Sequence, residues 1–176
     1  MIFFTADTHF NHTNVIRYCH RPFGSSDEMN EALIVNWNSV VTTRDEIYHL
    51  GDFGFRDSTD ILSRLNGKIY FIEGSHDKHL INSPNFRARV TVLPKYYTLK
   101  VDNLRIILCH YCMRTWPRSH HGTWHLHGHS HGNLGAIGKS LDVGVDNHSF
   151  FPWSLAEVKA YMDDRPDNFN HHKKDK

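Results

Sequence analysis

The stretch MIFFTADTH, residues 1–9, is an apolar run that stops abruptly at polar residues. Ile2 to Ala6 is typical of a short buried strand, and Asp7-Thr8-His9 follows at its end. The same pattern recurs four times: Asp52 after 46–50, Ser75 and His76 after 68–73, His110 after 104–109, and His129 and His131 after 125–127. Strand ends on one side of an α/β sheet form a natural ligand crevice, so these five distant segments are expected to converge.

The spacing of the polar residues adds to this expectation. Asp7 and His9 are two residues apart, as are His129 and His131. In extended backbone, residues i and i+2 point the same way, so each pair can present two ligands to one cavity. Glycines stand beside the candidates at 51, 74, 128 and 132, where tight turns are needed. Each short motif alone is common, and only their joint order is informative.

The remaining pattern predicts an α/β sandwich with mixed sheets in the middle and helices outside. We expect a helix over 27–41 capped by Ser26 or Asp27, a short helix over 59–65, and strands over 88–93, 96–101 and 141–145. Ser154 and Glu157 have capping-box spacing, which opens a last helix to about Met162. The sequence thus predicts one domain, residues 1–164, and a frayed polar tail, residues 165–176.

Composition narrows the function. Twenty basic and 19 acidic residues leave a net charge of +1, which gives no general attraction to nucleic acid or an anionic membrane. Sixteen histidines favour metal ligation. Three cysteines, no basic leader and no long apolar run predict a cytoplasmic protein without a membrane span. The pair Cys109 and Cys112 lacks the context of a redox or zinc motif.

The motifs together resemble those of the calcineurin-like metallophosphoesterase family, and most of all its small stand-alone members in bacteria and phages. They are Asp7-Thr-His9, Gly51-Asp52, Gly74-Ser-His76-Asp77, Cys109-His110 and Gly128-His129-Ser-His131, and they span residues 1 to about 131. The resemblance implies a four-layer αββα sandwich of two mixed β-sheets flanked by helices. It also implies two divalent transition-metal ions, for which carboxylates and imidazoles suit Mn²⁺ first, and Fe, Zn²⁺ or Ni²⁺ as alternatives.

The resemblance also assigns roles. Metal one would take Asp7, His9, Asp52 and His131, and metal two would take Asp52, residue 75, His110 and His129. Asp52 would bridge the ions and serve catalysis, with a metal-bridging hydroxide attacking phosphorus. His76 would bind no metal and would protonate the leaving oxygen as general acid.

Ser75 departs from the family pattern, which has Gly-Asn-His-Asp at this point. The asparagine normally supplies a carbonyl oxygen to metal two, whereas serine offers a hydroxyl or a water held by it. The second metal is therefore expected to be weaker. Two interpretations stay open: a variant whose shell is completed by Ser75 or water, and a catalytically weakened metal-binding scaffold.

Further residues flank the ligand segments. Asn11 and His12 are the chosen substrate contacts, with Arg17, Arg21, Arg114 and Arg118 as weaker candidates. Asp77 either orients His76 or caps a short helix. His125 and His127 are alternative ligands, although hydrogen bonding beside the site suits His127 better. Tyr111, Phe53, Trp116 and Trp124 are candidates for stacking on a base, or pack under the loops.

These features favour a phosphodiesterase that acts on a nucleotide, a cyclic nucleotide or a short nucleic acid. A phosphomonoesterase is the alternative. Protein phosphatases of the family extend the second motif as Gly-Asp-x-x-Asp-Arg-Gly, whereas residues 51–57 read GDFGFRD and lack its second aspartate. The sequence leaves the natural substrate, the native metal and the oligomeric state open.

Overall fold

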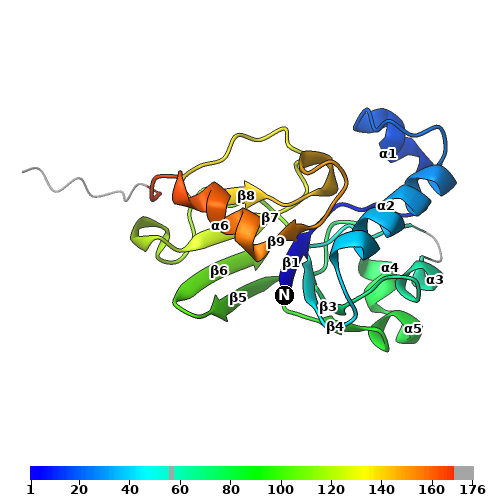
Figure 1. Cartoon of the computed structure of the whole chain (residues 1–176), viewed down its shortest axis with the longest axis horizontal. Helices are drawn as coiled ribbons and strands as arrows, with labels where there is room; N and C mark the ends of the chain where they lie inside the picture. Colours follow the sequence, from blue (N-terminus) through cyan, green and yellow to red (C-terminus); the bar gives the residue numbers. More distant parts are fainter. Residues whose placement is uncertain (56–57, 169–176) are drawn as a thin grey trace, which may run out of the picture.

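The computed structural model describes residues 1–55 and 58–168 and contains two β-sheets flanked by helices (Figure 1). The first sheet has the order β4-β3-β2-β1-β9 and the second the order β5-β6-β7-β8. Their bounds are β1 Ile2–Thr5, β2 Glu46–His49, β3 Lys68–Phe71, β4 Val90–Val92, β9 Trp153–Ser154, β5 Tyr96–Val101, β6 Leu104–Cys109, β7 Trp124–His127 and β8 Ser140–Asp142. Strands β1 to β4 are parallel with β9 antiparallel, and β6 to β8 are parallel with β5 antiparallel, so both sheets are mixed as expected.

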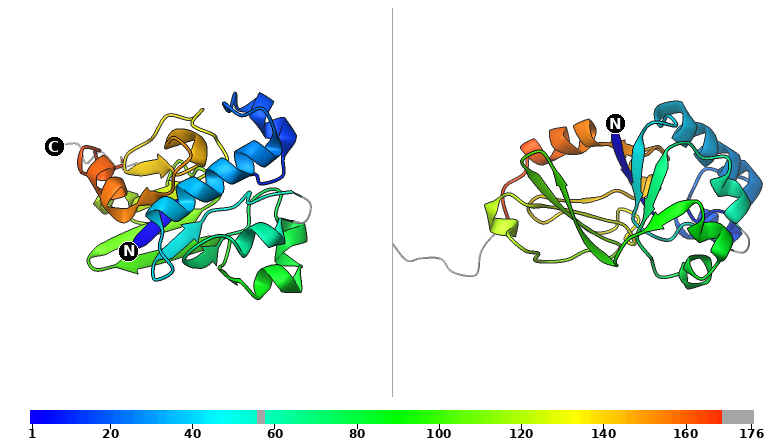
Figure 2. Two further views of the ribbon diagram at one scale, coloured as in Figure 1. Left: turned by 45° about the vertical axis from the view of Figure 1, so that its right-hand side comes forward. Right: turned by 90° about the horizontal axis from the view of Figure 1, so that it is seen from below.

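The helices gather mainly on the outer face of the first sheet (Figure 2). They are α1 Thr13–Tyr18, α2 Ser26–Val40, α3 Thr59–Leu62, α4 Lys78–Ile81, α5 Pro84–Arg87 and α6 Leu155–Asp163, with 3-10 turns at Ser119–His121 and Val145–Asn147. The predicted α/β sandwich of two mixed sheets flanked by helices is therefore confirmed.

Alternation along β1 explains the two cores. Phe3 packs in a cluster with Leu33 and Trp37 of α2, whereas Phe4 packs in a second cluster with residues of both sheets, such as Tyr48 and Leu126. Successive strand side chains point to opposite faces, so β1 is covered on both sides. This burial holds the end of β1, and with it Asp7, at the centre of the molecule.

The sequence predicts the type of several helices and strands correctly, but it predicts their bounds less well. The capping box of α6 is present at Ser154 and Glu157. The cap of α2 is Ser25 and not Ser26 or Asp27, because Ser25 has extended backbone and its side chain accepts from the N–H of Glu28. Helix α3 ends at Leu62 and β8 at Asp142, both earlier than expected. Helices α1 and α5 were not predicted, because four to six residues show little periodicity, whereas α4 is the short helix considered after Asp77.

The predicted tail boundary was wrong for residues 165–168. Arg165 donates to the carbonyl oxygens of Gly138 (3.1 Å) and Ala136 (2.9 Å). Asn168 is buried and donates to the carbonyl oxygen of Arg114 at 3.0 Å. The rest of the predicted tail, residues 169–176, lies outside the described residues. No helix within 1–55 and 58–168 combines the length and the apolar character needed to cross a bilayer.

The outer face of the second sheet carries a buried histidine. The Nδ1 of His125 lies 3.1 Å from the carbonyl oxygen of Ile107 and so donates to it, while its Nε2 accepts from the N–H of Met113 at 3.1 Å. The ring also packs 5.3 Å from that of Trp116. Burial, together with the nearby His127, lowers the pKa of His125 to about 4. The folded protein thus holds this imidazole neutral.

Because the folded protein holds His125 neutral, we expect its stability to fall in acid. In unfolded chain His125 binds a proton below about pH 6.5, but in the folded protein only below about pH 4, so stability rises with pH across that window. His125→Gln should remove roughly 3 kcal/mol of this pH dependence. Urea unfolding in chelator at pH 4.5 and pH 7 measures it, with the exposed His121→Gln as control. An unchanged difference between the two pH values contradicts the assignment.

Candidate metal centre

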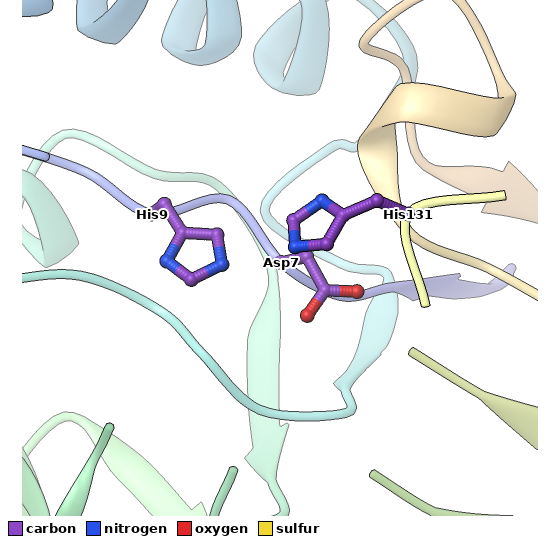
Figure 3. A group of neighbouring side chains, drawn as sticks. All are labelled: Asp7, His9 and His131. Carbon is purple, nitrogen blue, oxygen red and sulfur yellow. The ribbon is translucent and has the colours of Figure 1, made fainter. Parts of the chain in front are cut away.

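The ends of β1, β2, β6 and β7 bring six of the predicted ligands together in two groups. Asp7, His9 and His131 form the first group, and Asp52, His110 and His129 form the second. Within each group one ligand atom per residue lies within 4.8 Å of the others. Figure 3 shows the first group, with Asp7 and His9 on the segment after β1 and His131 on the segment after β7. The first group contains three of the four residues that the resemblance assigns to metal one, and the second contains three of the four assigned to metal two.

Asp52 lies between the two groups. Its Oδ2 is 3.8 Å from Nε2 of His9 and 3.5 Å from Nε2 of His110. Its Oδ1 accepts from the backbone N–H of His76 at 2.9 Å. Burial disfavours the charged carboxylate, but the neighbouring imidazole of His110 outweighs burial and holds the pKa of Asp52 below its usual range. One oxygen of an ionised carboxylate is thus placed to serve both groups.

The buried atoms of the site fit a metal ion. Oδ1 of Asp7, both ring nitrogens of His9 and Nε2 of His110 are buried without a hydrogen-bond partner. Burial raises the pKa of Asp7 to about 7 and lowers the pKa of His9 well below its usual value. Unpartnered buried polar atoms are costly, and a divalent cation would satisfy them together. Neutral imidazoles and carboxylates form the donor set that such a cation requires.

The ligands converge for a different reason than expected. Asp7, His9, Asp52, His129 and His131 have positive φ angles of 57°, 51°, 55°, 68° and 46°. The pairs two residues apart are therefore not in extended backbone, and that part of the sequence argument was wrong. Left-handed backbone is sparsely populated by non-glycine residues and costs about 1–3 kcal/mol each where it is strained, so it clusters at functional sites.

Backbone and carboxylate partners orient two of the imidazoles. Nδ1 of His110 lies 2.7 Å from the carbonyl oxygen of Leu50, so this nitrogen donates and Nε2 stays free toward Asp52. Nδ1 of His131 lies 2.7 Å from Oδ2 of Asp146. A hydrogen bond at one ring nitrogen fixes which nitrogen remains for a metal. Both rings thus keep Nε2 for the site.

Asp77 has neither of its expected roles. It precedes α4 but its side chain makes no capping bond, and it does not contact the ring of His76 by any hydrogen bond between described residues. Its buried carboxylate instead accepts backbone N–H bonds from Asp52 (2.6 Å), Phe53 (2.9 Å) and Gly74 (2.7 Å). Asp77 therefore ties the segment after β2 to the segment after β3.

These two segments approach so closely that glycine is required. A Cβ on Gly74 would lie 2.4 Å from the backbone nitrogen of Asp52, and one on Gly51 would lie 2.6 Å from Cα of Gly74. Gly51 also has φ +98°. Any side chain here would push the bridging carboxylate away from its neighbours.

Two further carboxylates at the site, those of Asp142 and Asp146, were not predicted from the sequence. Asp142 accepts from the hydroxyl of Ser130 (2.6 Å) and the N–H groups of Gly132 (3.0 Å) and Gly144 (2.8 Å), which shapes the segment that carries His129 and His131. Asp146 bonds His131. Asp142 is the last residue of β8 and Asp146 lies four residues later, so the pattern of acidic residues at the end of a strand would have identified them.

An open cavity of about 530 Å³ lies above the ligands. It is lined by His9, His12, Val15, Tyr18, Cys19, Asp52, Phe55, Ser75, His76, His129, His131 and Asn133. His12 and His76 thus border it as expected. Asn11 is not among these residues, and its side-chain oxygen accepts from Asn30 at 2.7 Å. Phe55, and not Phe53, faces the cavity, because Phe53 is buried in the core.

Other candidates lie elsewhere. Arg21 is buried and its donors are used within the protein, which does not suit a phosphate contact. His127 has its Nδ1 3.0 Å from the carbonyl oxygen of Gly128, and neither it nor His125 joins a ligand group of the described residues. Trp116 and Trp124 are buried, whereas Tyr111 is 48% exposed beside the rings of His110 and His129. The three cysteines are free.

The chain shares its fold with solved proteins of low sequence identity. A solved archaeal phosphodiesterase superposes with a TM-score of 0.50 and 18% identity over 81% of each chain. The protein of unknown function AQ665 from Aquifex aeolicus superposes with a TM-score of 0.72 and 21% identity, over 92% of this chain and 98% of that one.

Sequence comparison identifies the family. The chain is 34% identical over 166 residues to the uncharacterized protein MJ1445 of Methanocaldococcus jannaschii, covering 88% of this chain and 86% of that protein. The chain therefore belongs to the same family as MJ1445. No family model matches the sequence. The expected closeness to small bacterial and phage members stays a prediction.

Removal of the shared carboxylate tests the centre. Asp52→Ala should abolish binding of both metal ions, because Asp52 lies between the two ligand groups. Elemental analysis after gel filtration in Mn²⁺ measures the bound metal per chain. Asp60→Ala, which alters an exposed carboxylate of α3, is the matched control. Retention of two equivalents by Asp52→Ala contradicts the bridging role.

Proposed function

We propose that the protein is a metal-dependent phosphoesterase, and specifically a phosphodiesterase that acts on a nucleotide, a cyclic nucleotide or a short nucleic acid. The observation that carries the proposal is the pair of ligand groups beside an open cavity, with Oδ2 of Asp52 lying between them. The unpartnered buried atoms of Asp7, His9 and His110 support occupation by cations. The fold shared with a solved phosphodiesterase is consistent with it.

Asp7, His9, Asp52 and His131 would hold the first ion, and Asp52, His110 and His129 the second, with Mn²⁺ as the proposed metal. Two such ions would stabilise charge on the phosphoryl oxygens and lower the pKa of bound water. Their protein ligands are held before substrate arrives, by Asp77 beneath Asp52 and by Leu50 behind His110. The protein thus contributes preorganisation, which reduces rearrangement during reaction.

His76 is the proposed general acid. Its backbone is fixed to Asp52 Oδ1, while its side chain borders the cavity and its ring lies 6.1 Å from that of His9. Phe55 packs 5.1 Å from the same ring and limits its position. An imidazole held here can give a proton to the leaving oxygen of a bound phosphoester, a contribution of about 10²–10⁴-fold in rate.

Two features favour a diester over a monoester. The described residues that line the cavity include neither lysine nor arginine, so little positive side-chain charge is present for a dianionic monoester. The side of the cavity formed by α1 presents Tyr18, which is 62% exposed, and Phe55 lies near His12 at a ring distance of 4.1 Å. Aromatic rings beside a phosphate site suit stacking on a nucleobase. A phosphomonoesterase remains the second candidate.

Turnover tests the function and the proton donor together. With Mn²⁺ the protein should hydrolyse bis(p-nitrophenyl) phosphate faster than p-nitrophenyl phosphate, and chelator should stop both. His76→Ala should keep bound metal and lose about 10²–10⁴-fold in rate on a diester with a poor, alkoxide leaving group. The exposed His121→Ala serves as control. Full activity of His76→Ala on the alkyl diester excludes its role as acid, and no turnover by metal-loaded wild type favours the scaffold.

Ser75 offers a further test. Its hydroxyl donates to Asp52 Oδ2 at 2.8 Å, the oxygen that lies between the two groups, and the second group has only three ligands of its own. Ser75→Asn should restore a carbonyl donor and tighten the second ion. Titration calorimetry with Mn²⁺, together with the rate at limiting metal, measures the change. Unchanged affinity would mean that Ser75 or water already completes the shell.

A further inference from the structure

Arg21 lies in the segment between α1 and α2, beneath the first ligand group, with its side chain 0% exposed. Its Nε and one terminal nitrogen donate to the two oxygens of Asp146, each at 2.8 Å. The same terminal nitrogen donates to the carbonyl oxygen of Asp7 at 2.7 Å, and the other donates to the carbonyl oxygen of Thr8 at 3.0 Å. One guanidinium thus joins the segment after β1 to the turn after β8.

Asp146 completes the connection from the other side. It lies in the 3-10 turn Val145–Asn147, and its Oδ2 also accepts from Nδ1 of His131 at 2.7 Å. The Asp146 carboxylate therefore directs the His131 ring, and the Arg21 guanidinium fixes that carboxylate.

These contacts all support the segments that carry the first ligand group. Arg21 holds the backbone of Asp7 and Thr8, the two residues directly before His9, and Asp146 holds His131. The second group is positioned by other contacts: Asp77 bonds the N–H of Asp52, and the carbonyl of Leu50 bonds His110. Among the described residues, Arg21 and Asp146 thus bond no residue of the second group, although Asp52 lies between the groups and Oδ2 of Asp7 accepts from the N–H of His129 at 2.8 Å.

The chemistry of the pair fits positioning better than stability. Buried ion pairs add little stability compared with apolar residues of the same volume, because both charges lose their hydration. Arg21 and Asp146 satisfy each other with parallel bonds, and the remaining donors of Arg21 meet carbonyls next to residues with positive φ. A planar guanidinium can make these bonds at once, which a lysine ammonium cannot.

We propose that Arg21 and Asp146 form a positioning pair that assembles the first ligand group and sets its metal affinity, with much less influence on the second. The inference rests on the proposed metal centre. It assigns Arg21 to the site as a support for Asp7, His9 and His131 and gives it no contact with substrate.

The test compares metal binding in full-length variants that need not turn over substrate. Wild type, Asp146→Ala, Asp146→Asn and Arg21→Lys are titrated with Mn²⁺ by calorimetry, and Mn²⁺ electron paramagnetic resonance distinguishes a coupled pair of ions from an isolated one. Glu31→Gln is the matched control, since it disrupts an exposed ion pair between Glu31 and Arg64. Both hydrogen bonds of this pair are 2.6 Å long, and neither residue belongs to the ligand groups. Thermal unfolding in chelator checks that each variant is folded.

We expect the second site to keep its wild-type affinity within about threefold in every variant. The first site should weaken by about 10–100-fold in Asp146→Ala and in Arg21→Lys, and the coupled signal should give way to an isolated one. Asp146→Asn keeps an acceptor for Nδ1 and should recover part of the loss. If Asp146→Ala fails to fold, Asp146→Asn and Arg21→Lys carry the same comparison.

Different outcomes distinguish a failure of the positioning role from a failure of the proposed metal centre. Folded variants that bind two ions with unchanged affinity overturn the positioning role, and so does equal weakening of both sites. Wild type that binds no Mn²⁺ overturns the proposed metal centre itself. Activity is not needed for any of these readings, so a wrong substrate class leaves the test intact.

Discussion

Burial of ligand atoms without protein partners is the constraint on which the site depends. Asp7 and His9 follow the central strand β1, which is covered on both faces, and both residues are buried. Burial raises the pKa of Asp7 to about 7 and depresses that of His9, and Oδ1 of Asp7 and both ring nitrogens of His9 remain unpaired. Such an arrangement is unfavourable in a metal-free protein and favourable once a cation binds. Metal binding at the proposed centre would therefore be linked to folding.

Three carboxylates that need not touch metal give the centre its shape. Asp77 joins the segments after β2 and β3, Asp142 shapes the segment after β7, and Asp146 directs His131. Each accepts at least two bonds from groups that would otherwise be free to rotate or to bond water. These hydrogen bonds hold the ligand residues in left-handed backbone conformations, which the same residues would leave if the bonds were absent. The positions of the ligand side chains are therefore set by loops that these three carboxylates hold in place.

The sequence predicted the location of the site because apolar runs followed by Asp or His are visible without any structure. The strands β5 and β6 have the bounds expected from their turns, and six of the seven predicted ligands lie in two compact groups. What could not be predicted was how the ligands converge. Positive φ at non-glycine residues leaves no signal in residue type, so Asp7 and His9 were placed on extended backbone incorrectly.

Long-range pairing explains the other misses. Asp77 was weighed only against its neighbours in sequence, whereas two of its three partners lie 24 and 25 residues away. Arg21 was considered as an exposed phosphate contact, but its partner Asp146 lies 125 residues away. Asn11 is likewise engaged by Asn30 of α2. Charge and hydrogen-bonding capacity can be read from a residue, but the partner that uses them is set by the fold.

The central claim is that two cations are held by ligand groups that share Asp52. Anomalous X-ray diffraction from crystals grown with Mn²⁺ tests it most directly, because it locates the ions without reference to activity. We predict one anomalous peak among Asp7, His9 and His131 and a second, of lower occupancy, among Asp52, His110 and His129, with Asp52 contacting both. Metal-saturated crystals with no peak at these residues, or with Asp52 bound to neither ion, would contradict the account.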